Sequence, residues 1–483
     1  MGDRMTALDA AFYHLERTGQ LLHVGGIYTA EGALDYDRAL ADLSARLHLI
    51  PRYTQRVVPV PLNLGHPTWE PARGFDIRMH VVRHALRRPG DDEQLRSLAS
   101  RLFAEPLSRS RPLWELHQID GYRGDRSALL AKVHHCMIDG VSGVQLLGVM
   151  FDPSPRPAPP PPAPDAKPAP PLPTRSAQAW RALADAAATT VEGLRDLGGL
   201  LRHPARALEE LQTTVTGLSE LLRLALAPIP QTPFNGFVGT LRRIEWATLD
   251  LNQVKAIKNR LGGTVNDVIL ATISGALRRY LESRGINPDR VELRAMCPVN
   301  LRTAAEHMKL GNRVSALMAP LPVGIFDPLE RLRQVRAAME QLKRSGESQR
   351  MSRMMDLLSY VPVPLQHQMG WVQSTPVNTI CTNVPGPPVS LYFQGKRLET
   401  MVPMVPLAQG VGLAFAILSY ADAITIGANL DPGLITDGER ISADLYTSFD
   451  ELRALANIEP STRRDPVRPE RQRRADAVPS RVA

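Results

Sequence analysis

Residues 128–140 read ALLAKVHHCMIDG. Their first part has the alternating pattern of a β-strand, in which successive side chains point to opposite faces. His135 lies on the same face as a set of apolar residues, Leu129, Ala131 and Val133. His134 lies on the other face with Leu130 and Lys132. If the strand stays regular to its end, His135 enters the interior of the protein and His134 points elsewhere.

A histidine in such a place can act as a general base. A neutral imidazole at the mouth of a dry channel takes a proton from a hydroxyl group and later returns it to a leaving group. Asp139 and Gly140 follow the strand as a tight turn, where the Asp139 carboxylate could pair with a cation or orient the ring. Two other interpretations stay open from these residues alone: Cys136 as an activated nucleophile, and a purely structural histidine pair. Adjacent histidines on a strand diverge, so they predict no metal site.

Strands and helices are interleaved on both sides of this stretch. In the first part of the chain, the apolar spacing predicts helices over Asp37–Leu47 and Asp92–Phe103, a strand over Phe75–His84, and a hairpin of Leu113–Ile119 with Ala128–His135. In the last part, it predicts helices over Asn252–Leu261, Val265–Leu281 and Pro328–Lys343, and strands over Leu241–Leu249, Val291–Asn300 and Val314–Pro320. This mixed order predicts an α/β protein of two units, each a sheet covered by helices.

A proline-rich segment separates the two units. The prolines of residues 152–174 prevent both helices and sheet ladders, which predicts an extended linker. Residues 175–232 have the 3–4 spacing of amphipathic helices and are the expected helical crossover. We therefore expect an N-terminal domain at 1–151, a C-terminal domain at 233–460 and a basic disordered tail at 461–483.

One uncharged stretch, residues 401–421, has the length of a membrane span. Its prolines and glycines interrupt that pattern and favour a short buried strand over Leu413–Tyr420. The chain is therefore expected to be soluble or peripheral.

Composition excludes several classes of protein. Hydrophobic residues make up 43% and charged residues 22%, which is ordinary for a globular protein. The formal net charge is +8, and half of it lies in residues 462–483, so the folded part lacks the concentrated basic face that nucleic-acid binding needs. The three cysteines are widely spaced and predict neither a disulfide framework nor a zinc site. A reducing, cytoplasmic environment fits these cysteines best.

Residues 134–140, HHCMIDG, have the pattern HHxxxDG and are one of several motifs along the chain. In order, they are LDAAFYHLE at 8–16, HVGG at 23–26, RPLWE at 111–115, HHCMIDG at 134–140, GGTVNDVIL at 262–270, CPVNLR at 297–302, GN at 311–312, TNVPGP at 382–387 and SY at 419–420. HHxxxDG is the signature of an acyltransferase superfamily that includes chloramphenicol acetyltransferase and nonribosomal peptide condensation domains. With all its motifs, the chain resembles the bacterial, mycobacterial-type wax ester synthase/diacylglycerol acyltransferase family.

This resemblance implies a fold and a reaction. The implied fold is two chloramphenicol-acetyltransferase-like domains, each a mixed sheet flanked by helices, with the active site in a tunnel between them. The implied reaction moves a fatty acyl group from acyl-CoA to diacylglycerol or to a long-chain alcohol, with no cofactor and no metal. His135 would be the base that deprotonates the acceptor hydroxyl, and direct attack on the thioester leaves Cys136 without a chemical role. Asp139 would be structural and paired with Arg302.

Other positions that match the family's motifs are expected to support the site. They are His134, Gly140, Asn266, Asp267, Asn312 and Asn383. Residue type alone explains some of them, because Thr264 to Asp267 has the pattern of a helix capping box and Asn383 begins a turn-like NVPG. Trp114 is expected in the core. One departure is Ala414, where many family members carry Asn, so the acceptor pocket is expected to differ.

Functions of different classes remain to be separated. The first alternative to a lipid acyltransferase is an acyltransferase of polyketide or peptide synthesis, whose acyl donor would be bound to a carrier protein. The non-enzymatic alternative is a degenerate paralogue that binds acyl-CoA or coats lipid droplets; the intact His135 and Asp139 speak against it, and Ala414 keeps it open. The expected partners are acyl-CoA and the acceptor lipid, not nucleic acid, in the cytoplasm with peripheral contact at the inner membrane or a lipid droplet.

Overall fold

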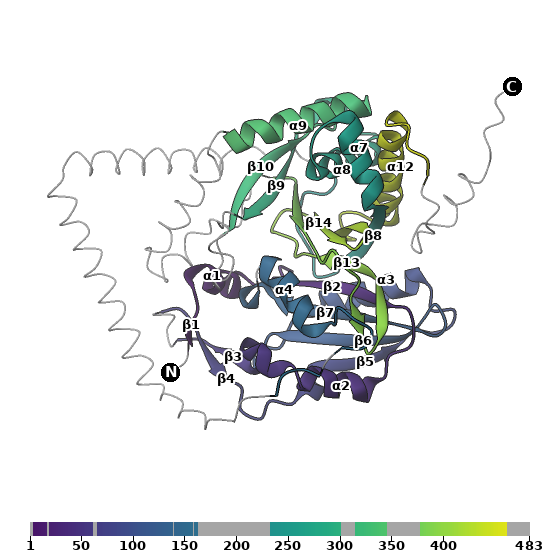
Figure 1. Ribbon diagram of the computed structural model, residues 1–483. Helices are drawn as coiled ribbons and strands as arrows, with labels where there is room; N and C mark the ends of the chain where they lie inside the picture. Colours follow the sequence, from purple (N-terminus) through teal and green to yellow (C-terminus); the bar gives the residue numbers. More distant parts are fainter. Residues whose placement is uncertain are drawn as a thin grey trace, which may run out of the picture.

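The computed structural model describes residues 3–16, 19–60, 65–138, 140–157, 159–162, 232–300, 314–344 and 377–460. Within these ranges the protein is an α/β structure built on two six-stranded sheets, which lie one above the other in Figure 1. Both sheets mix parallel and antiparallel neighbours and carry helices. The predicted fold class is confirmed.

The N-terminal sheet has the strand order β12-β13-β2-β7-β6-β5. Its strands are β2 (His23–Ala30), β5 (Val81–Ala85), β6 (Trp114–Tyr122), β7 (Arg126–His134), β12 (Tyr392–Phe393) and β13 (Lys396–Met404). Helix α3 (Asp92–Ala104) covers one face, while α2 (Tyr36–Ser44) and α4 (Gly140–Met150) cover the other. α3 begins at Asp92 because the Asp91 side chain accepts a hydrogen bond from the Gln94 amide at 2.9 Å.

The C-terminal sheet has the order β10-β9-β11-β14-β15-β8. Its strands are β8 (Arg243–Asp250), β9 (Leu293–Asn300), β10 (Val314–Leu321), β11 (Thr379–Val384), β14 (Leu413–Tyr420) and β15 (Ala423–Leu430). Four helices pack on its outer face, above the sheet in Figure 1: α7 (Leu251–Leu261), α8 (Val265–Ser283), α9 (Pro328–Arg344) and α12 (Glu439–Leu455). The opposite face looks toward the N-terminal half, because Leu418 and Tyr420 of β14 belong to the N-terminal core.

The two halves are joined by an exchanged strand. β13 comes from the C-terminal half of the sequence, but it pairs antiparallel with β2 of the N-terminal sheet, with Met401 opposite Tyr28. β13 also lies against β15 of the C-terminal sheet, and Figure 1 shows it running from the upper part of the molecule into the lower part. Residues 392–404 are therefore structurally part of the N-terminal sheet, although the sequence places them within 233–460.

Smaller elements complete the N-terminal half. Helix α1 (Ala7–Leu15) begins after Thr6, whose hydroxyl accepts from the Asp9 amide at 3.2 Å. A three-stranded sheet has the order β1-β4-β3, formed by Asp3–Arg4, Thr68–Pro71 and Gln55–Val58. Short 3₁₀ turns cover Leu47–Leu49, Pro51–Thr54, Ile77–Met79 and His135–Met137, and another, Pro288–Arg290, lies in the C-terminal half.

Most predicted elements are confirmed, and one is wrong in part. The Leu413–Tyr420 strand has the predicted bounds, and the uncharged stretch around it is buried sheet and loop. The predicted strand Phe75–His84 is shorter: it begins only at Val81, because the Asp76 side chain accepts from the Arg78 amide at 2.9 Å and starts a 3₁₀ turn. The expected crossover helices and the basic tail lie outside the described residues. Among the residues that the structure describes, no helix is both long and apolar enough to span a membrane.

Candidate functional site

The two histidines sit where β7 ends, and their burial corrects the expectation from alternation. β7 stops at His134, and His135–Met137 form a 3₁₀ turn. His134 is fully buried, whereas His135 is half-buried. The condition for His135 to continue the inward apolar face, a strand that stays regular to its end, is not met, because β7 stops one residue earlier. We call residues 134–138 the histidine turn.

The ring of His135 is held by α1. It stacks on Phe12, with ring centroids 4.1 Å apart and planes inclined by 17°. Its backbone amide donates to the Leu22 carbonyl at 2.8 Å, so the chain just before β2 fixes the main chain of the turn. α1 and the histidine turn are in direct contact. The stacking on Phe12 restrains the His135 ring, and the hydrogen bond to Leu22 restrains its main chain. Together they restrict the directions that the imidazole can take.

His134 is hydrogen-bonded through one ring nitrogen, and the other faces a carboxylate. Its Nδ1 accepts a hydrogen bond from the Cys136 amide at 3.1 Å, and its Nε2 lies 3.6 Å from Oε2 of Glu16. Glu16 also accepts from the Leu22 amide at 3.3 Å and from Arg109 at 3.2 Å. Burial raises the pKa of the Glu16 carboxyl, but the neighbouring His134 ring and the hydrogen bonds from Arg109 and Leu22 outweigh it and lower the pKa to about 2. Glu16 is therefore ionised at neutral pH.

Cys136 does not have the surroundings of a nucleophile. Its side chain is buried in an apolar cluster with Tyr13, Trp69 and Leu113. Burial, with the negative charges of Asp9 and Glu16, raises the pKa of the thiol well above its usual range. Because the thiolate is the reactive form, this environment opposes the alternative in which Cys136 attacks a substrate.

A buried ionic cluster lies on the α3 face beside His134, and alternation alone did not reveal it. The Lys132 ammonium, fully buried, donates to the carbonyls of Leu102 and Glu105 at 2.9 and 3.0 Å and pairs with Glu115 at 3.0 Å. The charged side chain thus binds the last carbonyls of α3, where a cation is favourable. A lysine directly opposite a glutamate on the neighbouring strand is the signal that could have identified the pair.

His23 completes the anchor of α3. It lies opposite His134 in the sheet and donates from Nε2 to the Phe103 carbonyl at 2.6 Å. Burial, reinforced by the positive charge of Lys132, lowers the pKa of His23 to about 3. The His23 ring is therefore neutral. The polar contacts of His23 and Lys132 hold the end of α3 against the sheet next to the histidine turn.

The predicted supporting residues of the C-terminal half meet at the start of α8. Thr264 and Asp267 form the expected capping box, in which Asp267 Oδ2 accepts from the Thr264 amide at 2.8 Å. Asn383, at the end of β11, donates to the side chain of Asn266 at 3.0 Å. Asn266 and Asn383 thus tie the helix to the sheet, whereas Asp267 caps the helix within its own first turn. Trp114 is buried in the N-terminal core, as expected.

Three site residues cannot be placed. Asp139, Arg302 and Asn312 lie outside the described residues, so the expected Asp139–Arg302 pair stays a prediction. Gly140 is the first residue of α4. Among the residues that the structure describes, no group of three or more His, Cys, Asp or Glu side chains could hold a metal ion.

The histidine turn lies at the meeting of the two halves. Met137 and Ile138 pack against the same apolar cluster as Val384 of β11 and Leu418 of β14. Further along the same face of β14, Ala414 is fully buried in a second cluster with Ile380, Val411 and Leu407, flanked by Met296 and Met318. The inner face of the C-terminal sheet is therefore apolar on both sides of Ala416.

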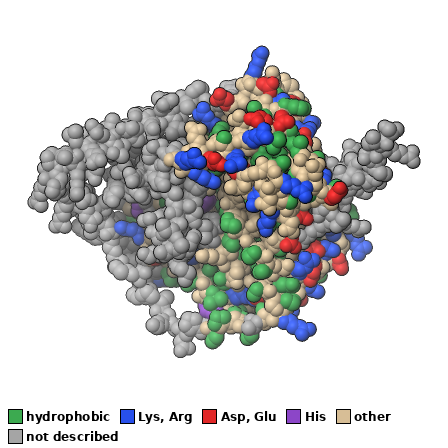
Figure 2. Space-filling view, turned by 45° about the horizontal axis from the view of Figure 1, so that its top comes forward, with side chains coloured by type: hydrophobic (Ala, Val, Ile, Leu, Met, Phe, Trp, Pro, Cys, Tyr) green, Lys and Arg blue, Asp and Glu red, His purple; other side chains and the backbone are tan. Residues whose placement is uncertain are grey.

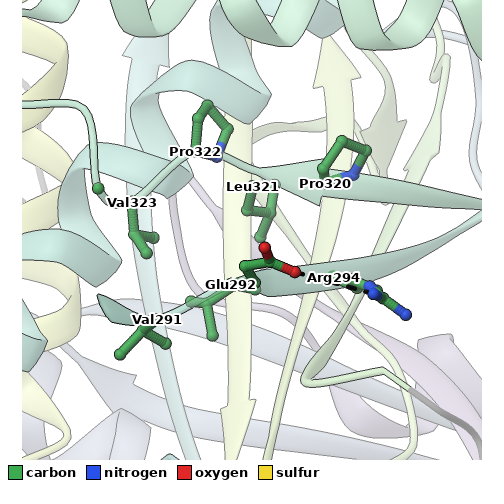
Figure 3. Close-up of a pocket in the computed structure, with 9 residues that line it drawn as sticks. Val291, Glu292, Arg294, Pro320, Leu321, Pro322 and Val323 are labelled. Carbon is green, nitrogen blue, oxygen red and sulfur yellow. Dashed lines mark ion pairs between the residues drawn. The ribbon is translucent and has the colours of Figure 1, made fainter. Parts of the chain in front are cut away.

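A pocket in the described part of the chain lies elsewhere, at one end of the β9–β10 pair. It has a volume of about 390 Å³, and Figure 3 shows Glu292 and Arg294 facing each other there at 3.9 Å. Its lining runs over residues 291–294 and 320–324 and includes none of the predicted site residues. It does not belong to the histidine turn.

Comparisons with known proteins agree with this arrangement. Residues 5–269 match the wax ester synthase/diacylglycerol acyltransferase catalytic domain, and residues 310–453 match the C-terminal domain of the same family. A probable diacylglycerol O-acyltransferase of Mycobacterium tuberculosis is 32% identical over 476 residues, which cover 96% of this chain and 98% of that protein.

Solved structures share the fold. The wax ester synthase/diacylglycerol acyltransferase from Marinobacter aquaeolei superposes with a TM-score of 0.66 at 24% identity, covering 94% of this chain and 100% of that one. The first condensation domain of the calcium-dependent antibiotic synthetase superposes with a TM-score of 0.60 at 15% identity, over 97% and 98% of the two chains. The family models cover both halves and the relative spans nearly the whole chain, so this chain belongs to the wax ester synthase/diacylglycerol acyltransferase family.

Proposed function

We propose that this protein is an acyl-CoA-dependent O-acyltransferase that uses His135 as its general base. Its acyl acceptor is the hydroxyl of diacylglycerol, of a long-chain alcohol, or of both. The observation that carries the proposal is the half-buried His135 ring, stacked on Phe12 at the junction of the two halves, in a chain of this family. The likeness to condensation domains concerns the fold and does not favour a carrier-protein donor.

The reaction needs one proton acceptor and no enzyme nucleophile. His135 takes the proton of the acceptor hydroxyl while its oxygen attacks the carbonyl carbon of the thioester. The carbon–sulfur bond breaks, and the imidazolium returns the proton to the departing CoA thiolate. Atoms and charge balance without a covalent acyl-enzyme, and the raised pKa of the Cys136 thiol supports this direct route.

Apolar surfaces near His135 support lipid substrates. Met137 and Ile138 follow His135 in the histidine turn and pack on an apolar cluster at the junction, and the inner face of β14 continues the apolar surface to Ala414. A dry environment keeps water from competing with the alcohol for the thioester. Ala414 removes a polar side chain that many family members carry, so we propose an acceptor pocket that is more apolar at this point.

Location follows from the substrates. Diacylglycerol and long-chain alcohols reside in membranes and lipid droplets, so we propose a cytoplasmic enzyme that works in peripheral contact with one of them. On the face seen in Figure 2, basic and acidic side chains are interspersed on the described part of the surface. Such a surface does not favour nucleic acid as a partner.

One incubation tests the proposed activity. The purified full chain is supplied with radiolabelled palmitoyl-CoA and either dioleoylglycerol or hexadecanol, and the lipid products are separated. We expect labelled triacylglycerol, wax ester or both, together with release of one free CoA thiol per ester. Absence of both esters with an intact, folded protein would contradict the proposal and favour an acyl-CoA-binding or lipid-droplet protein.

A further inference from the structure

Glu16 has a position that the family's motif does not explain. It follows α1 directly, as the residue that ends the helix, and its side chain turns inward to the histidine turn. The carboxylate faces three donors: the Leu22 amide, the Arg109 guanidinium and His134 Nε2. Its side chain is only 7% exposed, which is low for a carboxylate. A buried anion with two hydrogen-bond donors and a ring nitrogen facing it restrains the groups around it.

The geometry fixes the tautomer of His134. Its Nδ1 accepts a hydrogen bond from the Cys136 amide, so this nitrogen carries no proton. In the neutral ring the proton is then on Nε2, and Nε2 is the atom that faces Glu16. The carboxylate favours the Nε2–H form and disfavours the alternative, in which Nδ1–H would oppose the Cys136 N–H. Glu16 thus preserves the bond that shapes the turn.

A second route leads from Glu16 to His135 itself. One carboxylate oxygen accepts from the Leu22 amide, and the Leu22 carbonyl accepts from the His135 amide at 2.8 Å. The two backbone groups of Leu22 therefore link the carboxylate to the main chain of His135. Phe12, four residues before Glu16 on the same α1 segment, stacks on the His135 ring. Glu16 joins the helix that orients the ring to the turn that carries it.

We propose that Glu16 is a positioning residue for acyl transfer, which holds His134 as the Nε2–H tautomer and thereby fixes the direction of His135. The inference rests on the proposed role of His135 and adds a residue to it. Glu16 touches neither substrate in this scheme. Hydrogen-bond partners that fix the tautomer of a metal-ligating histidine typically cost roughly 10–100-fold in activity when they are removed, and we expect a loss of that order here.

Glu16→Gln separates charge from shape. The amide has the size of the carboxylate, but a single oxygen cannot accept from Leu22 on one side and from Arg109 and His134 on the other. We expect kcat to fall by roughly 10–100-fold, with the KM for palmitoyl-CoA changed less than about twofold, since a group that acts on orientation affects the chemical step. The ¹⁵N signals of the His134 ring, in protein labelled at histidine, should shift away from the pure Nε2–H pattern. Glu245→Gln is the matched control, because it also removes a buried, arginine-paired carboxylate, whose partners are Arg96 and Arg243 rather than the histidine turn.

The pathway through His134 has its own test. If part of the effect of Glu16 runs through that ring, the Glu16→Gln/His134→Gln double variant should be slowed by less than the product of the two single losses. Should Glu16→Gln fail to fold, Glu16→Asp retains the charge with a shorter reach, and we expect an intermediate kcat with the His134 signals partly shifted. Multiplicative losses in the double variant, or an unshifted His134 spectrum in the variant that folds, would overturn the inference.

The outcomes distinguish this inference from the proposed function. Acyl transfer that survives His135→Ala would contradict the proposed general base. A His135→Ala variant without activity beside a Glu16→Gln variant at wild-type rate would contradict the positioning role alone. Loss of thermal stability in Glu16→Gln with unchanged kcat at a temperature where it is folded would also count against positioning and leave a purely structural carboxylate.

Discussion

His135 and Phe12 are stacked face to face, with ring centroids 4.1 Å apart. The contact joins a turn residue, which the sheet no longer orients, to a helix near the start of the chain. His135 lies one residue past the end of β7, so strand alternation does not set its direction. Its direction is set by a neighbouring ring and by the backbone bond to Leu22. A base that must meet a hydroxyl proton within hydrogen-bonding distance needs such restraint.

Phe12→Leu should slow acyl transfer without unfolding the protein. Leucine fills much of the same space but offers no flat face, so the His135 ring gains rotational freedom. We expect kcat to fall by about 10-fold, because loss of geometry in a positioned group is costly, while Phe12→Tyr should stay within about twofold of wild type. Steady-state kinetics at saturating palmitoyl-CoA, with a thermal melt of each variant, make the comparison. Equal rates for Leu and Phe would mean that stacking has no part in the reaction.

The three neighbours in the histidine turn should respond differently to substitution by alanine. His135→Ala should lose about 10²–10⁴-fold in rate with little change in melting temperature, as expected for a general base. His134→Ala should lose more stability than His135→Ala, because it leaves the Cys136 amide and the Glu16 carboxylate without their ring partner. Cys136→Ala should remain nearly as active as wild type.

Mass spectrometry of the protein during turnover completes that comparison. Direct attack by the alcohol predicts an unmodified chain at every time point. An acyl group trapped on Cys136 would replace the one-step scheme by a two-step one, in spite of the raised pKa of the thiol.

His23 should make the protein sensitive to acid. In the unfolded chain a histidine binds a proton below its ordinary pKa of 6.5, whereas in the folded protein burial holds the pKa of His23 at about 3. Between these values the unfolded state binds more protons, so the stability rises with pH and is lost as the pH falls from 6.5 toward 3. One such group contributes a slope of up to about 1.4 kcal/mol per pH unit.

Urea unfolding at several pH values measures this slope. His23→Gln keeps an N–H donor for the Phe103 carbonyl but cannot titrate. We expect the variant to lose less of its free energy of unfolding than wild type between pH 6.5 and pH 5. This interval lies above the ordinary carboxyl pKa of 4.5, so Glu16 and Glu115, whose pKa values are lowered to about 2 only in the folded protein, contribute little to the slope there. Identical slopes for the two proteins would show that His23 is protonated in the folded state as well.

Local patterns predicted most elements of this fold, because each depends on residues close in sequence. The hairpin of β6 and β7 follows from alternation, and α8 follows from apolar spacing after a capping box at Thr264. The partner of β13 could not be predicted in this way. Its pairing with β2 joins residues more than 350 positions apart, and the alternation within either strand does not indicate which strand is its partner.

The site was predictable in composition but not in geometry. HHxxxDG drew attention to His134 and His135, yet the direction of His135 depends on where β7 ends, and alternation does not fix the end of a strand. Glu16 was part of a matched motif with no assigned task, because its three donors come from separate segments of the chain. Contacts of this kind become visible only when the elements are packed.

Gly427→Ala should push strands β13 and β15 apart where β13 crosses β15. Gly427 of β15 lies under the exchanged strand β13, and a Cβ atom there would lie 2.1 Å from the Pro403 carbonyl oxygen and 3.5 Å from a methyl of Val402. The first distance is far inside van der Waals contact with backbone, so β13 or β15 has to move. Overpacking of this kind costs about 1–3 kcal/mol, and more when backbone must shift.

Gly148→Ala is the control for this variant. Gly148 is exposed on α4 with no neighbouring atom within 4 Å of an added Cβ, so alanine there should leave stability unchanged or raise it by up to about 1 kcal/mol. Acyl transfer should fall in Gly427→Ala, because β13 and β15 hold together the halves whose junction carries His135, and it should stay at the wild-type level in Gly148→Ala. Urea unfolding and the palmitoyl-CoA assay give both quantities. A Gly427→Ala protein as stable and as active as wild type would mean that β13 is not packed on β15 in solution.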